Sequence, residues 1–418
     1  MKKQIIGMVA LGLMMAVPAM AEEAVMSKFK VSLYGFVKLD YVNNSVDLGE
    51  NGGMLLPTSG KIPAAGTQAF KDTQSIFTAR QSRLGLKISG PDLGGAKTGA
   101  VIETDFYGDY AASNNQQTES PTMRMRLAYG TVDWTNTQIL FGQNWDIFGP
   151  MVASTVDFRS GAGWGAPNTP RVPQLRVTQK YNMGENNTLA VVLGLENPTQ
   201  DYTDVTKAGS MVNGAGQVMF TSKALGTAPG YYGLGMKPLT VGLFGAYGNQ
   251  TINNPNTNLN SWGYGLYTFI PVVKSADGKG RANSASFEAQ IYEAANMSFN
   301  GATSEATFGT GNQTNAAKGF GVAAQLIYYP TQELGVTAGY GLKAAINAGN
   351  YTAKNYDNSN YQLYLNAAYD FNAAVRVAAE YQYARTNYGN PTLDVATNPG
   401  KTDFGFANIM RVSAFYFF

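Results

Sequence analysis

The stretch that decides the fold is the last one, 404–418, which reads FGFANIMRVSAFYFF. Even positions such as Phe406 and Met410 fall on one face at a period of two, and odd positions such as Arg411 and Ser413 fall on the other. The pattern predicts a strand that continues to the final residue. An open sheet ending in such a strand would expose an unpaired, apolar edge, whereas a closed barrel pairs the last strand with the first. We therefore expect a transmembrane antiparallel β-barrel.

The N-terminus has the pattern of a secretory signal. Lys2 and Lys3 precede an apolar run over 5–17, and Ala19-Met20-Ala21 matches a cleavage site. This run is too short to span a bilayer as a helix, and no later window is long and apolar enough to do so. We predict a signal peptide over 1–21 and a single outer-membrane barrel domain over 22–418.

Composition excludes several classes of function. The chain has no Cys and no His, so Ser-His or Cys-His catalysis and His- or thiolate-bound metals are ruled out. A net charge of +2 does not favour nucleic acid as a partner. We expect no enzyme activity, no catalytic residue, no metal and no cofactor. Abundant glycine, 48 residues, and only 14% charged residues suit a β-rich protein with many turns.

The strands have connections of alternating length. Long connections follow the first, third and fifth strands and each alternate strand after them, whereas most of the other connections are short turns. Bacterial outer-membrane barrels have this alternation of periplasmic turns and extracellular loops. Sixteen strands are expected, with eighteen as the open alternative. They are 29–42, 81–89, 96–107, 122–133, 137–145, 173–182, 188–196, 216–223, 238–248, 261–273, 285–299, 319–329, 334–346, 360–370, 375–387 and 404–418.

Cations gather on the predicted inner face of the early strands. Arg124 and Arg126 share that face of the fourth strand, with Met123, Met125, Leu127 and Tyr129 on the other face. A narrow channel focuses the field of such charges, and guanidinium groups bind carboxylates in a bidentate manner. The predicted pore-lining, solute-guiding residues are Lys38, Arg83, Lys87, Arg124, Arg126 and Arg176.

An alternative interpretation is a structural network in which each cation pairs with an acid across the wall. Glu103 lies roughly opposite Arg83 around one turn, and Asp146 lies roughly opposite Arg124 around the next. Pairing and anion attraction are compatible, because an unmatched cation remains after pairing. The later strands instead carry small inward residues with few charges. These residues include Gly321, Ala323, Gly335, Gly339 and Gly341.

The long connection over 146–172, DIFGPMVASTVDFRSGAGWGAPNTPRV, follows the fifth strand. It mixes Gly, Pro and aromatic residues with four charges, so we expect it to fold into the barrel and narrow the lumen, with a surface-capping loop as the alternative. The predicted constriction residues are Asp146, Asp157, Arg159 and Arg171. Aromatic residues at strand ends are predicted to form membrane girdles. They include Trp134, Trp145, Trp262, Tyr328, Tyr329 and Tyr416.

Four short stretches resemble the DcaP-like porins of Gram-negative outer membranes. They are GFVKLD at 35–40, ARQSRLG at 79–85, GQNWDIF at 142–148 and PQLR at 173–176. The likeness implies a homotrimeric channel that admits small anionic organic acids, including dicarboxylates. This chain departs from some members by lacking their long N-terminal helical extension. The terminal Phe418 is similar to the signal that the barrel-assembly machinery recognises.

Taken together, these patterns predict a porin of the Gram-negative outer membrane, reached after secretion to the periplasm. It would let small hydrophilic solutes diffuse passively and would favour anions such as small organic (di)carboxylates. Its other expected partners are outer-membrane lipid and lipopolysaccharide. The alternative function is a structural or adhesive barrel whose long extracellular loops bind a partner.

Overall fold

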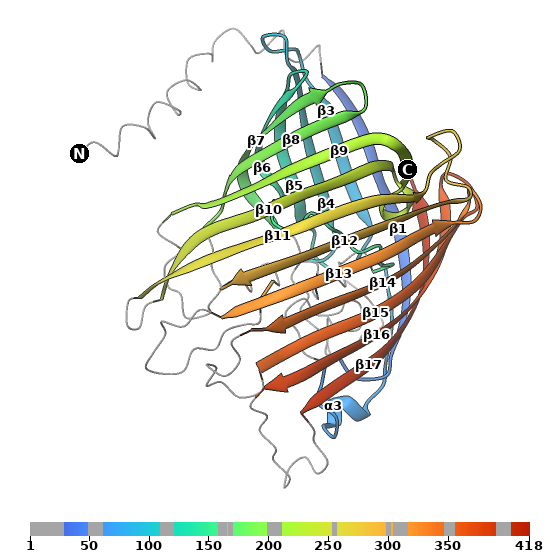
Figure 1. Ribbon diagram of the computed structural model, residues 1–418. Coiled ribbons are helices and arrows are strands. Elements are labelled where there is room, and N and C mark those ends of the chain that lie inside the picture. Colours follow the sequence, from blue (N-terminus) through green and yellow to red (C-terminus); the bar gives the residue numbers. More distant parts are fainter. Residues whose placement is uncertain are drawn as a thin grey trace.

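Antiparallel strands close into one ring in the computed structural model (Figure 1). The ring closes between β1 (Lys30–Asn44) and β17 (Phe404–Phe417), with Val37 opposite Tyr416. The predicted barrel fold is therefore confirmed. The structure describes residues 29–48, 62–108, 121–157, 165, 170–198, 211–252, 257–297, 302–303, 317–346, 356–389 and 403–418. The predicted signal peptide, 1–21, lies outside these residues.

Two strands share one position in the ring. β2 (Gln74–Thr78) pairs with the end of β1, and β3 (Arg83–Ser89) pairs with its beginning. The seventeen strands of the sheet therefore fill sixteen positions, as predicted, although β2 was not expected. The other strands are β4 (Lys97–Asp105), β5 (Arg124–Asp133), β6 (Thr137–Trp145), β7 (Arg171–Met183), β8 (Asn187–Glu196), β9 (Asn213–Pro229), β10 (Met236–Ile252), β11 (Thr257–Val273), β12 (Ser284–Ala295), β13 (Lys318–Tyr329), β14 (Leu334–Ala345), β15 (Tyr356–Asp370) and β16 (Val375–Gly389).

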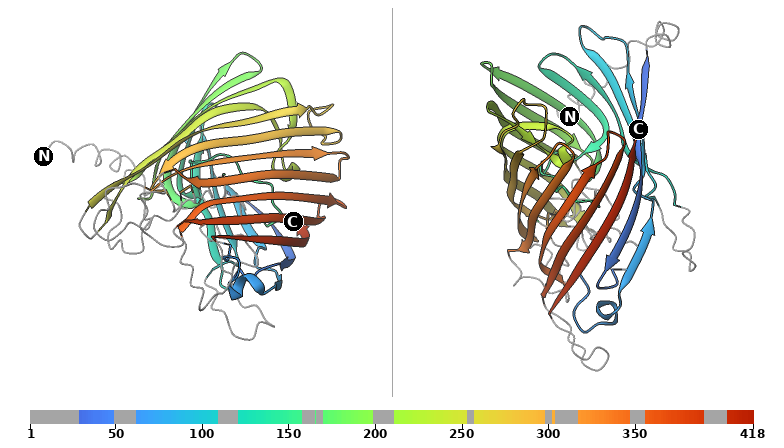
Figure 2. Two further views of the ribbon diagram at one scale, coloured as in Figure 1. Left: turned by 60° about the horizontal axis from the view of Figure 1, so that its bottom comes forward. Right: turned by 90° about the vertical axis from the view of Figure 1, so that its right-hand side faces the viewer.

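The two faces of the barrel differ in polarity, because side chains alternate along each strand. Leu39 and Val412 are exposed on the outside, whereas Arg411 and Ser413 between the outward residues of β17 are buried inside. The strands run obliquely around the ring in both further views (Figure 2). An apolar exterior and a polar interior suit a barrel that stands in lipid with a hydrated lumen.

Short helices occur only outside the strands in the described part of the chain. They are α3 (Gln68–Lys71), beside the ends of β1 and β17 (Figure 1), and the 3-10 turn η2 (Tyr231–Gly233). A backbone hydrogen bond of 2.7 Å from Asp47 to Ala69 holds α3 at the rim. None of the described helices is long and apolar enough to cross a membrane.

A β-bulge in β5 changes which residues face inward. Glu103 of β4 lies opposite Leu127, but its neighbour Thr104 lies opposite Met125, so Arg126 is the extra residue. Leu127 is buried beside Arg126. The prediction that Leu127 and Tyr129 share the outward face of Met125 is therefore wrong, because a bulge shifts the alternation by one position.

Candidate functional site

The connection between β6 and β7 enters the barrel, and its residues 146–157 lie against the inner wall. Its backbone N–H groups donate to four wall side chains: Ile147 to Glu196 over 3.0 Å, Met151 to Gln290 over 3.0 Å, Ser154 to Gln325 over 2.8 Å, and Val156 to Glu380 over 2.7 Å. Its carbonyl oxygens accept hydrogen bonds from Lys38, Gln81, Gln217, Gln325 and Asn366. The predicted inward fold of the loop is confirmed for this part.

These bonds explain why the lumen tolerates a loop. An extended segment inside a barrel has no partner strand, so its backbone polar groups need side-chain partners. Inward Gln, Asn and Glu residues of β8, β9, β12, β13, β15 and β16 supply them, together with Lys38 and Gln81. We refer to residues 146–157 below as the inner loop.

The apolar side chains of the inner loop pack on the same wall. Phe148 meets Phe244 and Tyr292 in edge-to-face contacts, with ring centroids 5.1 and 5.8 Å apart. Met151 and Ala153 belong to the same buried cluster. This half of the lumen is therefore filled by the loop and its supporting rings.

Small wall residues make room for those rings. A Cβ added to Gly321 would lie 2.3 Å from the Tyr292 ring, and one added to Gly339 would lie 2.1 Å from the Tyr364 ring. Tyr364 in turn donates a hydrogen bond of 3.0 Å to Gln325, which holds Ser154 of the inner loop. The expected difference between the two sides of the lumen thus has a steric basis.

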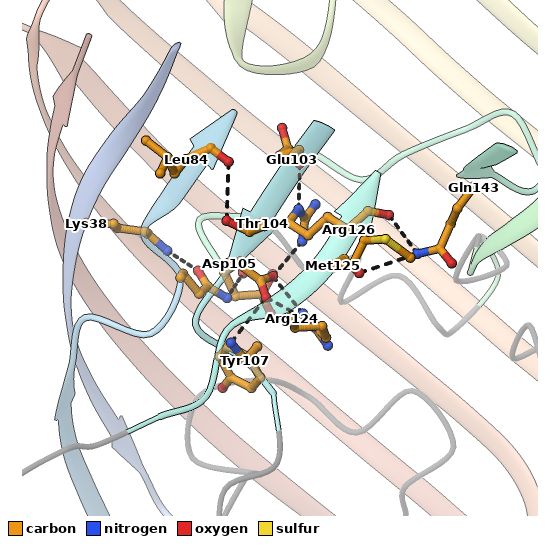
Figure 3. A network of polar contacts seen from close by, with 12 residues as sticks. Lys38, Leu84, Glu103, Thr104, Asp105, Tyr107, Arg124, Met125, Arg126 and Gln143 are labelled. Atoms are coloured by element: carbon orange, nitrogen blue, oxygen red, sulfur yellow. Dashed lines mark hydrogen bonds and ion pairs between the residues drawn. The ribbon is translucent and has the colours of Figure 1, made fainter. Parts of the chain in front are cut away.

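Cations of β3, β5 and β7 line the opposite wall. Arg124 donates two hydrogen bonds to Asp105, of 3.0 and 2.7 Å (Figure 3). Arg126 bonds both Glu103, at 2.6 Å, and Asp105, at 2.8 Å. Two cations and two carboxylates form a quartet with no net charge, as the pairing interpretation expected. Glu103 pairs with Arg126, however, and Asp146 is not part of this network.

Two further arginines extend this wall without a paired acid. Arg171 and Arg176 form no ion pair with any described carboxylate. Arg176 donates a hydrogen bond of 2.5 Å to the carbonyl of Trp145, and Arg171 lies 5.2 Å from the centroid of its ring. Arg171 is also within electrostatic range of Arg124 and other cations. Two carboxylates, Asp146 and Glu196, lie within electrostatic range of Arg176, whereas the charged neighbours of Arg171 are mostly cations. The positive charge of this wall therefore lies mainly at Arg171.

The other predicted pore-lining residues, Lys38, Lys87 and Arg83, differ from one another in their exposure. Lys38 has no exposed surface, because it bonds Asp40 at 2.9 Å and the carbonyl of Val156 at 2.7 Å. Its location beneath the inner loop prevents contact with a solute. Lys87 is exposed, 4.9 Å from the Tyr34 ring centroid. Arg83 lies on β3, 5.2 Å from the centroid of the Phe36 ring.

The predicted constriction residues do not form one group. Asp146 is buried and accepts a 2.9 Å hydrogen bond from the Phe148 N–H, while Asp157 accepts one of 2.7 Å from Thr155. Both carboxylates thus order the inner loop itself. Arg171 is the first residue of β7, so it belongs to the wall and not to the loop. Arg159 lies outside the described residues.

Two aromatic residues assigned to membrane girdles lie beside arginines: Trp145, which is 39% exposed, and Tyr329, which is buried. Trp145 lies over Arg126 and Arg171, with centroid distances of 5.6 and 5.2 Å. Tyr329 is buried, 4.8 Å from Arg281. Trp134, Tyr328 and Tyr416 are exposed, as a girdle requires. The sequence could have indicated the contacts of Trp145, because the strands on either side of its own carry Arg126 and Arg171.

Solved structures with the same architecture were found. The outer membrane channel DcaP of Acinetobacter baumannii aligns with a TM-score of 0.67 and 19% identity, covering 96% of this chain and 100% of DcaP. The chain has the fold of an outer-membrane porin. The anion-selective porin from Comamonas acidovorans aligns at 0.56 and 11% identity, covering 94% of this chain and all of that one. Salmonella typhi OmpF aligns at 0.52 and 13%, covering 94% and 99%.

Sequence comparisons add no family assignment to this barrel. No protein-family model matches the chain, and no curated protein matches it. The resemblance to the DcaP-like porins, which rested on four short stretches, is supported at the level of the fold. The predicted outer-membrane location agrees with the names of the structural neighbours.

Proposed function

We propose that this porin is a passive diffusion channel that favours small anions, including organic mono- and dicarboxylates. The observation that carries the proposal is that Arg171 and Arg176 form no ion pair with a described carboxylate, beside a neutral quartet, and that the charged neighbours of Arg171 are mostly cations. Each guanidinium can bind a carboxylate through two parallel hydrogen bonds, and the low-dielectric wall focuses the field of the pair. The anion-selective porin from Comamonas acidovorans shares the fold, which is consistent with this preference.

The decisive variant removes the unpaired charges and leaves the quartet intact. Changing Arg124 and Arg126 together would strand Glu103 and Asp105 as buried, unpaired carboxylates, so Arg171→Gln/Arg176→Gln is the cleaner test. A unit charge about 8 Å from a permeating ion contributes about 0.5 kcal/mol in a water-like dielectric, which is about twofold in local anion concentration per cation.

The measurement is the reversal potential in a planar bilayer under a potassium chloride gradient. The parent is expected to pass chloride more readily than potassium. In the double variant, the ratio of chloride to potassium permeability is expected to be about fourfold lower. Lys97→Gln is the matched control, because this exposed lysine pairs with Asp92 in a turn away from the wall arginines. A parent that prefers potassium, or a double variant equal to the parent, would refute the proposal.

We also propose a homotrimer. OmpT of Vibrio cholerae, which aligns at a TM-score of 0.51 and 14% identity over 94% of this chain and all of that one, has been solved in a trimer form. Mass measurement of the detergent-extracted protein before heating is expected to give three chains per particle. A single chain per particle would exclude the trimer while leaving the channel proposal in place.

A further inference from the structure

The outer face of β15, β16 and β17, which lie side by side in the ring (Figure 1), changes character along the strands. In β16 every second residue faces outward, because the residues between them, such as Ala384 and Thr386, are buried inside. The outward residues pass from aliphatic to aromatic and then to polar. In order from the turn, they are Val375, Val377, Ala379, Tyr381, Tyr383, Arg385 and Asn387. Arg385 is therefore a cation on the face that the barrel presents to lipid.

The position of Arg385 along β16 sets its depth in the membrane. It lies about ten residues beyond Val375, which is about 33 Å along the strand and, at a tilt of about 45°, about 23 Å along the membrane normal. The apolar band of an outer-membrane barrel is about 25 Å tall. Arg385 thus lies where hydrocarbon gives way to headgroups, on the side of the long connections, which are extracellular in this class of barrel.

Aromatic rings surround Arg385 on the same face. Its guanidinium carbon lies 4.3 Å from the centroid of the Phe404 ring. Phe404 stacks on Phe406, with centroids 6.5 Å apart, and Phe406 stacks on Tyr383, at 6.2 Å. Tyr361 of β15 continues the row, 6.2 Å from Tyr383. We call Arg385 and these rings the girdle patch.

Neutral groups hold the guanidinium of Arg385. Its Nε donates a hydrogen bond of 2.9 Å to the Asn387 side chain, and Tyr383 is its other polar neighbour. Arg385 forms no ion pair with a carboxylate of the described residues, including Asp403, which precedes β17. A guanidinium has five N–H donors, so these neutral partners leave donors for an acceptor that brings negative charge.

A second outward cation shows what the girdle patch lacks. Lys318 of β13 lies 5.7 Å from the centroid of the Trp262 ring, again on the side of the long connections. The neighbouring strand β12, however, carries an outward carboxylate, Glu293, which accepts a hydrogen bond of 2.7 Å from Tyr264. Each of these two regions has a cation on an aromatic ring, but only the region of Lys318 has its own acid among the described residues.

We propose that the girdle patch binds a phosphate group in the headgroup of an outer-leaflet lipid. Arg385 holds the phosphate, because a guanidinium binds phosphate through two parallel hydrogen bonds. The rings pack beside the lipid, since aromatic side chains favour the boundary between hydrocarbon and headgroups. The phosphate supplies the negative charge that the described residues of the patch lack. The inference does not rest on the proposed anion preference, because the patch lies outside the lumen.

Two substitutions separate the charge of Arg385 from its shape. Arg385→Gln removes the charge and keeps a polar side chain, whereas Arg385→Lys keeps the charge and loses the planar fork. Lys97→Gln is the matched control, because this exposed lysine pairs with Asp92 in a short turn at the opposite end of the barrel. Folding of each variant is checked by its heat-sensitive shift on a denaturing gel.

The measurement is lipid binding to the detergent-extracted barrel by native mass spectrometry. The probes are lipid A, which is the phosphorylated, acylated disaccharide of lipopolysaccharide, its dephosphorylated form, and inorganic phosphate as a competitor. Arg385→Gln is expected to bind lipid A about tenfold more weakly than the parent, as loss of hydrogen bonds between charged groups predicts. Arg385→Lys is expected to lie between them, and Lys97→Gln to match the parent. Dephosphorylated lipid A is expected to bind the parent and Arg385→Gln equally.

The outcomes distinguish a lipid from the other occupants. Equal binding of lipid A by the parent and Arg385→Gln would overturn the proposal. Displacement of lipid A by equimolar inorganic phosphate would assign the site to the free ion. An Arg385→Gln protein that keeps lipid A but falls apart into single chains would assign the patch to a contact between copies, which also overturns the lipid site. The reversal potential that tests the channel is measured separately, so either proposal can fail alone.

Discussion

At the scale of single residues, depth inside the lumen decides what a charge can do. Lys38 and Arg176 are both inward residues on alternating strands, and both were predicted to guide solutes. The structure buries Lys38 completely under the inner loop, whereas Arg176 keeps part of its surface exposed. Periodicity along one strand reports the face of a residue but not what another segment lays over it.

The Lys38→Met variant tests the structural role of this lysine. It removes the 2.9 Å partner of the buried Asp40, which keeps Arg411 at 3.5 Å, and it removes the bond to the Val156 carbonyl, so we expect the barrel to lose about 1–3 kcal/mol of stability. The temperature at which the folded band disappears on a denaturing gel should fall. Lys97→Met, which breaks an exposed pair, should cost at most about 1 kcal/mol. Equal melting of the parent and Lys38→Met would contradict a structural Lys38.

At the scale of the element, the inner loop fits against the wall because glycines of the wall leave room for the aromatic rings that support the loop. Gly339 of β14 leaves space for the Tyr364 ring, and that ring positions Gln325, which holds the inner loop. The wall glycines are therefore part of the constriction although they carry no functional group.

Gly339→Ala should disturb this chain of contacts. Its new Cβ would overlap the Tyr364 ring, at 2.1 Å, so we expect a loss of about 1–3 kcal/mol and larger current fluctuations as the inner loop loosens. Gly214→Ala in β9 is the matched control, since nothing lies within 4 Å of its added Cβ. Thermal melting and open-channel noise measure the two effects. A Gly339→Ala channel as quiet and stable as the Gly214→Ala channel would show that Tyr364 does not hold the loop.

The strands were the most predictable elements, because each long strand repeats its alternation many times. The strand expected over 334–346 is observed as Leu334–Ala345, and the one over 137–145 as Thr137–Trp145. β2 was missed because Gln74–Thr78 is too short for its alternation to stand out from a polar, glycine-rich stretch. The bulge at Arg126 was missed because an extra residue is visible only against the partner strand.

The candidate site was predictable in its parts but not in its pairing. The sequence pattern indicated an inward loop and a wall of arginines, since charged inward residues and a long Gly- and Pro-containing connection are local features. Which arginine lacks an ion-pair partner depends on the register between neighbouring strands. That register places Asp105 between Arg124 and Arg126 and leaves Arg171 beside Trp145. The position of the connection between β9 and β10 depends on contacts with the distant strands β12 and β16, which no local pattern encodes.

At the scale of the whole molecule, the lumen has one wall filled by the inner loop and one wall of partly compensated cations. The passage of an uncharged solute is limited only by the width between the two walls, whereas an anion also experiences the field of Arg171 and Arg176. Such a field is screened over a Debye length of about 10 Å at 0.1 M salt and about 3 Å at 1 M. Selectivity from charge and selectivity from size therefore respond differently to ionic strength.

This difference gives a test that needs no substitution. The ratio of chloride to potassium permeability in the parent should fall toward the ratio of the free ions as the mean salt concentration rises from 0.1 to 1 M, because screening shortens the reach of the wall arginines. Reversal potentials at a constant tenfold gradient measure it. The Arg171→Gln/Arg176→Gln channel should respond much less, since the remaining quartet is neutral. A parent ratio that stays constant over this range would mean that width or wall contacts, and not the field of the arginines, select the ion.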